Sequence, residues 1–294
     1  MAILPDLDIS LIPLYRKTKN YYLSHRAGSH SYFIGFIVSI FIALIFTSVY
    51  EGIFWWYLLV GFLFYSLHVS LDLITTSKTP IFYPLSKKEY RLNFERAVNP
   101  ALMVISFCVV LFFLYLFFND IDWGIRFYFR NVFFVGYYGY FFYRAITKIY
   151  INLRLSDYQS YLPGILPFVY YVYEKNSDPE GINIKLIKKI QYFPVKKELF
   201  NQKISNDSEE MKYYKQALEY SNRYRYFIKW EGVVPIIKNF LDRIFVLLFL
   251  SESYGNGSAY SLKLEISKKS GRIIHNSDGF YVLKRVEKKL HPMD

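Results

Sequence analysis

The sequence has very little cysteine and none of the common short catalytic motifs. Cys108 is the only cysteine and lies within a long apolar stretch, which excludes a disulfide framework and a zinc site built from cysteines. The chain has no glycine-rich phosphate loop, no serine nucleophile elbow and no His-Glu-x-x-His pair. Residues 1–20 lack the long apolar core of a signal peptide, so we expect none to be cleaved.

Apolar and aromatic residues are abundant instead, and they gather in the first half of the chain. Hydrophobic residues make up 53% of the sequence and aromatic residues 21%, both high for a soluble protein. The apolar stretches 31–50, 53–74 and 97–118 are each long enough to cross a bilayer core of about 30 Å. A fourth stretch, 125–150, contains arginine and lysine, and is either a span or an interfacial helix. We therefore expect an α-helical integral membrane domain of about four transmembrane helices over residues 1–150.

The second half, residues 151–294, is basic and has a different pattern. Runs rich in β-forming residues predict strands at 165–174, 182–193, 224–230, 243–250, 260–266 and 280–285. A polar cluster at 205–207 predicts a helix over 208–221. The sequence thus predicts that a small cytoplasmic α+β domain, mostly antiparallel, follows the membrane domain.

Positive charges are distributed unevenly among the loops of the membrane half. Lysine and arginine precede the first apolar stretch and lie between the second and third, whereas the connections at 51–52 and 119–122 carry acidic residues without lysine or arginine. The positive-inside rule then predicts a multi-pass protein of the cell membrane with both termini in the cytoplasm. The formal net charge of +12 suits attraction to anionic membrane lipids. No nucleic-acid-binding motif is present, so we expect no nucleic-acid partner.

Ionisable residues stand at the cytoplasmic ends of the first two predicted spans. His68 and Asp72 are four residues apart, which places them on one helix face. His25 and His30 precede the first span, and Gly28 lets the chain bend between them. Because the two helices are joined by a tight turn, these four side chains are predicted to meet at one depth.

Imidazole and carboxylate ligands suit a divalent metal, with zinc as the first candidate and manganese or iron as alternatives. Such an ion acidifies a bound water and makes it a hydrolytic nucleophile. Asp72 is either a ligand or a group that orients a ligating imidazole. On their own, His68 and Asp72 fit an ordinary polar helix end better than a metal site. The prediction depends on both motifs meeting.

The same residues resemble a known family. Residues 25–31 (HRAGSHS) resemble the His-Arg-x-x-Thr-His-Ser motif of the YdjM-like membrane-bound metal-dependent hydrolases. Residues 68–86 are similar to that family's second motif, in which His-x-x-x-Asp is followed by Thr-Thr and Tyr-Pro-x-Ser. The resemblance extends over about residues 20–150. Lys78 stands where the family has glycine, and Asn99 stands where it has the aspartate of Asp-Pro; if that aspartate helps to bind metal, its loss lowers the affinity or changes the metal.

The resemblance implies a membrane-embedded hydrolase. Its His-x-x-x-Asp signature is similar, more distantly, to zinc-dependent phospholipases C and related nucleases, which implies a phosphoester or phospholipid substrate. Asp72 and Arg26 would be catalytic, with Arg26, Lys87 and Arg91 available to neutralise a phosphate or merely to set the topology. The alternative is a non-catalytic membrane protein in which the His/Asp cluster is a structural clamp and the basic domain binds a partner or lipid. A transporter is a weaker third interpretation.

Overall fold

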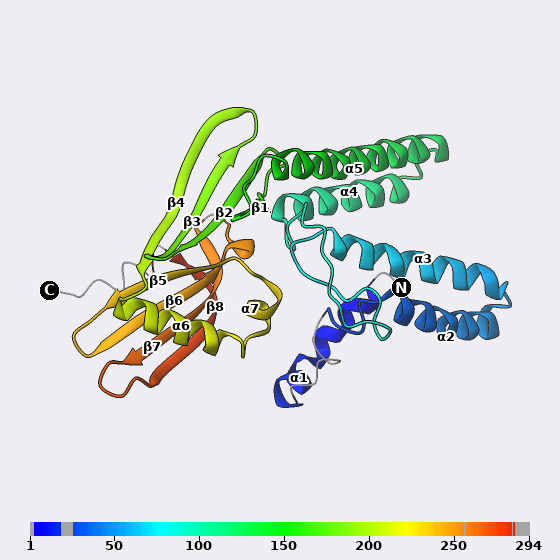
Figure 1. Cartoon of the computed structure of the whole chain (residues 1–294). Coiled ribbons are helices and arrows are strands. Elements are labelled where there is room, and N and C mark those ends of the chain that lie inside the picture. Colours follow the sequence, from blue (N-terminus) through cyan, green and yellow to red (C-terminus); the bar gives the residue numbers. More distant parts are fainter. Residues whose placement is uncertain (1–2, 19–25, 256, 284, 286–294) are drawn as a thin grey trace. The chain divides into compact units, whose positions relative to one another are not determined.

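The structure is a computed structural model that describes residues 3–18, 26–255, 257–283 and 285 (Figure 1). Contacts within the chain divide it into two compact units, Met1–Asn93 and Phe94–Asp294. The boundary near residue 150 rests on composition rather than on contacts, and it stays a prediction.

The first unit consists of two short helices and one long helical hairpin. The 3-10 helix η1 (Leu4–Leu11) leads into α1 (Ile12–Thr18), and the hairpin is formed by α2 (Tyr32–Tyr50) and α3 (Phe54–Leu73) (Figure 1). The hydroxyl of Ser31 caps α2 by accepting a hydrogen bond from the backbone N–H of Phe33 at 3.2 Å. Glu51 adopts a left-handed backbone, with φ of 49°, where the chain reverses between the helices.

A row of small residues on α2 lets the two helices of the hairpin approach closely. Gly35, Ser39 and Ala43 are the buried residues of α2, and their spacing of four places them on one face. A Cβ atom on Gly35 would lie only 2.3 Å from Cδ1 of Tyr65 on α3, so the tyrosine ring occupies the space that a larger side chain would need. Packing of this kind holds helices together in a bilayer.

The second unit begins with another helical hairpin, formed by α4 (Pro100–Phe118) and α5 (Trp123–Asn152). Asn99 caps α4, because its Oδ1 accepts from the backbone N–H of Ala101 at 3.0 Å. The hydroxyls of Ser106 and Tyr137 lie 2.7 Å apart and join the two helices. Among the described helices, α2, α3 and α4 are long and apolar enough to cross a membrane. Three candidate spans are therefore present, and α5 as a fourth span stays a prediction.

A buried ion pair fixes α5 to the segment that precedes α4. Nη2 of Arg144 donates to Oε1 of Glu95 at 2.8 Å, and Nε donates to Oε2 at 3.0 Å. Nη2 also donates to the carbonyl of Gly164 at 2.7 Å. Arg144 is fully buried and Glu95 nearly so, and such charges are tolerated inside a protein only when they are paired and hydrogen-bonded.

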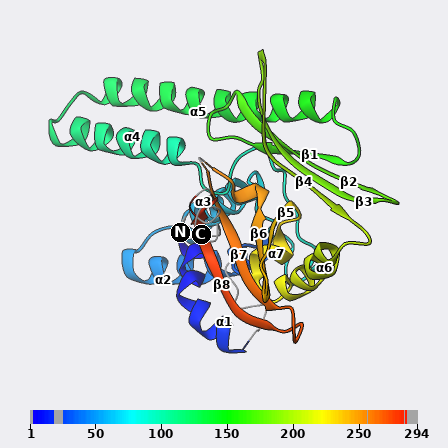
Figure 2. The same cartoon turned by 90° about the vertical axis from the view of Figure 1, so that its left-hand side faces the viewer.

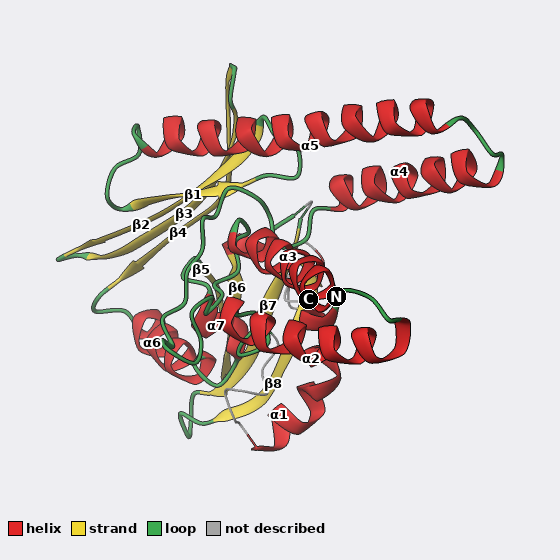
Figure 3. Ribbon diagram, turned by 90° about the vertical axis from the view of Figure 1, so that its right-hand side faces the viewer, coloured by secondary structure: helices red, strands yellow, loops and turns green. Residues whose placement is uncertain are grey.

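Two four-stranded antiparallel sheets complete the second unit (Figure 3). The first contains, in spatial order, β1 (Gln159–Pro163), β2 (Val169–Asp178), β3 (Gly181–Ile190) and β4 (Phe193–Ser205). The second contains β5 (Val233–Asn239), β6 (Arg243–Leu250), β7 (Ser258–Ser267) and β8 (Ile273–Val282). The helices α6 (Glu209–Ser221) and α7 (Arg225–Lys229) connect the sheets, and the 3-10 helix η3 (Ser251–Ser253) follows β6.

Most of the buried core of this unit lies against β6. The side chains of 244–250 are all buried, and they form one cluster with residues of α6 and of the neighbouring strands. The predicted strand at 243–250 and the predicted helix at 208–221 are confirmed. The predicted strand at 224–230 is wrong, because Arg225–Lys229 forms the short helix α7. A short apolar run does not distinguish the two structures by its periodicity.

Candidate metal centre

Two of the ionisable residues that stand out in the sequence lie on the last turns of α3. His68 and Asp72 share one helix face, and Nε2 of His68 is 3.6 Å from Oδ2 of Asp72. Asp72 is buried and His68 is half-buried. The end of α3 therefore presents an imidazole and a carboxylate side by side.

The turn that precedes α2 brings His30 to the same place. Its side chain is fully buried, and its Nε2 lies 3.0 Å from Oδ2 of Asp72. The imidazole rings of His30 and His68 have centroids 5.3 Å apart. The left-handed residue of this turn is Arg26, with φ of 59°, rather than Gly28.

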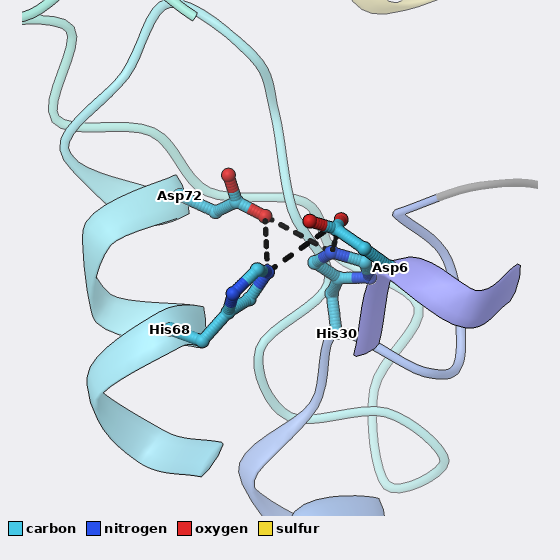
Figure 4. Close-up of side chains that lie close together, drawn as sticks. All are labelled: Asp6, His30, His68 and Asp72. Carbon is cyan, nitrogen blue, oxygen red and sulfur yellow. Dashed lines mark ion pairs between the residues drawn. The ribbon is translucent and has the colours of Figure 1, made fainter. Parts of the chain in front are cut away.

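A fourth side chain comes from η1, a segment that carries no recognisable motif. Oδ1 of Asp6 lies 3.3 Å from Nε2 of His30 and 3.6 Å from Nε2 of His68. Figure 4 shows the carboxylates of Asp6 and Asp72 turned toward the two imidazoles, with the ribbon of η1 approaching from the side opposite α3. The Asp6 side chain is 41% exposed, so this side of the cluster is open.

The spacing of these four groups fits a metal ion. Each residue offers one ligand atom, and the four atoms all lie within 4.8 Å of one another. A tetrahedral zinc about 2.0–2.1 Å from its ligands separates neighbouring ligand atoms by about 3.3 Å. Four separations in the cluster are 3.0, 3.3, 3.6 and 3.6 Å. Two imidazoles and two carboxylates suit zinc, manganese or iron.

Nε2 of His68 provides an independent test of this fit. The atom is buried and forms no hydrogen bond within the part of the chain that the structure describes. A buried polar atom without a hydrogen bond destabilises a fold by about 1–3 kcal/mol. An ion at the centre of the cluster would satisfy it, so the donor set fits a metal.

A third carboxylate, that of Asp8, orients His30 through the other nitrogen of its imidazole ring. Asp8 is buried, and its Oδ2 accepts hydrogen bonds from the backbone N–H of Arg26, at 3.0 Å, and from the Ser29 hydroxyl. This oxygen lies 3.4 Å from Nδ1 of His30, and Oγ of Ser29 lies 3.0 Å from the same nitrogen. With Nδ1 engaged in this way, Nε2 is directed into the cluster, as in many metal-binding histidines.

The surrounding carboxylates determine the charge of His30. Burial alone lowers the pKa of its imidazole, because it removes the charged form from water. Hydrogen bonds to Asp6, Asp72 and Asp8 outweigh this effect and raise the pKa of His30 to about 9. Without a metal, the imidazole therefore carries a proton at neutral pH.

Arg26 contacts the cluster from its outer side. Its Nη2 lies 2.9 Å from Oδ1 of Asp72, which leaves Oδ2 to face His30 and His68. The structure thus places Arg26 as a positioning residue for Asp72, while its predicted contact with a substrate phosphate stays a prediction. His25, predicted as a ligand, lies outside the described residues.

The two departures from the family pattern have structural explanations. Lys78 is not among the residues with a left-handed backbone, so its position does not require glycine. Asn99 uses its oxygen to cap α4 and its Nδ2 to donate to Oε1 of Glu95 at 3.0 Å and to the carbonyl of Ile165 at 3.0 Å. An aspartate could not donate these bonds, so Glu95 favours asparagine here.

The apolar helices and the His/Asp cluster define a multi-pass membrane protein with a group that could hold a metal ion. The chain belongs to the YdjM inner membrane protein family, whose model matches residues 1–147. This range includes all four residues of the cluster. No curated protein and no solved structure matches the chain.

Proposed function

We propose that this protein is a membrane-bound, metal-dependent hydrolase that cleaves a phosphoester or phospholipid at the cytoplasmic face of the membrane. In this proposal α5 is a fourth span, and both termini lie in the cytoplasm. The positive charges around 16–26 and 78–96 support that orientation.

The observation that carries the proposal is the set of short separations among Asp6, His30, His68 and Asp72. These ligand atoms stand where α2 begins and α3 ends. In a bilayer that both helices span, the cluster would lie near the ester bonds of the phospholipids. The open side at Asp6 gives such a substrate a way to reach the cluster.

The chain's own residues would prepare the site for hydrolysis. Asp6, His30, His68 and Asp72 would hold the ion, and Asp8 and Ser29 would keep His30 in the orientation described above. A bound divalent ion supplies a Lewis acid and a water whose pKa is low enough for it to react near neutral pH.

Positive side chains near the cluster would bind the phosphate. Arg91 donates from Nη1 to the carbonyl of Thr76 at 3.2 Å, so it is held in place rather than extended freely into solvent. Arg26 is held in place by its ion pair with Asp72. Lys87 is exposed and lies in the same basic segment as Arg91.

The experiment is elemental analysis of the purified protein together with a phosphodiesterase assay. Wild type should contain about one zinc, manganese or iron ion per chain and should hydrolyse a phospholipid or an aryl phosphodiester. H68A and D72A should lose both the metal and the activity. H275A, a change at an exposed histidine of β8, should keep both. Wild type without stoichiometric transition metal would refute the proposal.

A structural clamp is the second candidate, and the number of ligands favours it. Four protein ligands are typical of closed, structural zinc sites, whereas catalytic sites keep one position open. A structural ion should resist chelators, and its removal should lower the melting temperature strongly. A catalytic ion should exchange freely, with the fold unchanged and the activity restored by added metal.

A further inference from the structure

The turn between β3 and β4 exposes several large apolar side chains. Tyr192, Phe193 and Val195 are 66%, 64% and 52% exposed. The adjoining loop between β1 and β2 adds the exposed side chains of Leu166 and Phe168, and the two segments touch where the Gln191 N–H donates to the Phe168 carbonyl at 2.9 Å. Single exposed apolar residues are ordinary, but a group of them marks a contact surface.

Four lysines surround the same turn. In the register of β3 and β4, Lys188 lies opposite Lys197, and Lys189 lies opposite Lys196. Like charges that face each other across two strands destabilise a sheet. In the described part of the chain, none of the four forms an ion pair. The repulsion between them would be relieved by an anionic partner.

Hydrogen bonds hold this turn against α5. The Tyr143 hydroxyl donates to Oε1 of Gln191 at 2.9 Å and lies 2.9 Å from the hydroxyl of Tyr192. The hydroxyl of Thr147 lies 3.3 Å from Oε1 of Gln191. Figure 2 shows the hairpin of β3 and β4 crossing α5 and projecting past it. These contacts therefore fix the position of the turn along the axis of the α4–α5 hairpin.

In a bilayer that α4 spans, this position of the turn corresponds to the lipid headgroup region. Asn99, which precedes the candidate span α4, lies 3.4 Å from the hydroxyl of Tyr140 on α5. Tyr143 is three residues further along α5, or about 4.5 Å beyond this level. The headgroup layer extends about 5–7 Å beyond the hydrocarbon core on each side. When α4 spans the membrane, the turn thus lies at the depth of the lipid phosphates.

We propose that the β3–β4 turn is a membrane-docking element that binds a bilayer surface rich in anionic lipid. Tyr192, Phe193 and Val195 enter the interface, where aromatic side chains are favoured. The four lysines bind anionic headgroups around them. The apolar surface favours lipid over nucleic acid as the partner. The proposal depends on α4 as a span and not on the metal or its chemistry.

The test measures the depth of a fluorophore in full-length protein in lipid nanodiscs. In a C108S background, V195C carries an environment-sensitive label, and the discs contain phosphatidylcholine with or without phosphatidylserine. The control is L241C, which is fully exposed in the β5–β6 turn. The β5–β6 turn precedes β6, whereas Tyr254 follows the opposite end of this strand. The Tyr254 carbonyl accepts a hydrogen bond from Arg96, which lies shortly before α4. Leu241 is therefore at the end of β6 that is farther from the start of α4. Lipids with headgroup spin labels should quench the Val195 label at least threefold more than the Leu241 label. Equal quenching would overturn the proposal.

A second arm tests the role of charge. Each lysine near an anionic surface changes the docking equilibrium by about fivefold. Replacing all four lysines by glutamine should therefore reduce the quenching in phosphatidylserine discs to the level of phosphatidylcholine discs, and high salt should do the same to the unsubstituted protein. Unchanged quenching in the glutamine variant, with an unchanged circular dichroism spectrum, would overturn the role of the lysines. A response of the Val195 label to a single-stranded oligonucleotide, without lipid quenching, would assign the surface to nucleic acid instead.

Discussion

Metal binding to the His30 cluster should release a proton, and its affinity should therefore depend steeply on pH. The carboxylates around His30 raise the pKa of its imidazole to about 9, whereas a metal binds only the neutral imidazole. Below pH 9 each unit of acidification should weaken zinc binding by about tenfold. Between pH 8 and pH 6 the loss should be about a hundredfold.

Calorimetric titration of zinc into the metal-free protein measures this release directly. At pH 7.5, titrations in buffers of different ionisation enthalpy should report close to one proton displaced per ion. The matched variant is D8N, because Asp8 is one of the groups that raise the pKa of His30 without being among the four proposed ligands. It should release a smaller fraction of a proton and bind zinc with a weaker dependence on pH.

The same pKa has the opposite consequence for the metal-free fold. A group whose folded-state pKa is raised stabilises the fold below its unfolded pKa of about 6.5, and this contribution disappears as the pH rises to the folded-state value. With a folded-state pKa of about 9 for His30, metal-free protein should lose about 3 kcal/mol of stability between pH 6.5 and pH 9. Zinc-loaded protein should not. Zinc affinity that is constant from pH 6 to pH 8 would refute this account of the cluster.

Three further substitutions test other contacts. D6N should weaken zinc binding by about tenfold or more, since even the loss of an outer hydrogen-bonding partner has about that effect; an unchanged competition titration would remove Asp6 from the ligands. N99D should lower unfolding stability by about 3 kcal/mol, because it places a carboxylate 3.0 Å from that of Glu95; equal thermal stability of N99D and wild type would contradict this. G35V should destabilise the α2–α3 hairpin by about 1–3 kcal/mol, whereas G136V should not, because Gly136 has open space around it. Equal melting temperatures of the two variants would show that the Tyr65 ring moves aside without cost.

The local part of the cluster was predictable from sequence, and the distant part was not. His68 and Asp72 share a helix face because of their spacing, and the tight hairpin places His30 at the same end. Asp6 gave no signal, because it stands far from His30 in a mixed segment without a motif, and only the fold of η1 returns it to the cluster. His25 and Arg26 were singled out together, but the ion pair of Arg26 with Asp72 depends on a left-handed backbone that no sequence pattern indicates.

In the second unit, the strength of the sequence signal decided what could be predicted. The run 244–250 is apolar on both faces, and this part of β6 is buried on both faces. The run 224–230 is rich in aromatic residues, a composition that suits a strand and also fits a short helix, and packing selected the helix α7. The division of eight strands into two separate sheets depends on which edges pair, and a single sequence carries little information about that pairing.

The row of small residues on α2 gives the cluster a mechanical property. Gly35 and Tyr65 fix how far α2 can slide along α3, and the two helices carry His30 and His68 at their ends. A slide by one residue is about 1.5 Å, which is enough to take ligand atoms now 3.0–3.6 Å apart out of reach of a common ion. The packing of α2 against α3 therefore sets the spacing of the His/Asp cluster. If the cluster binds a metal, a bilayer whose thickness changes the tilt of these two helices should change the affinity for that metal.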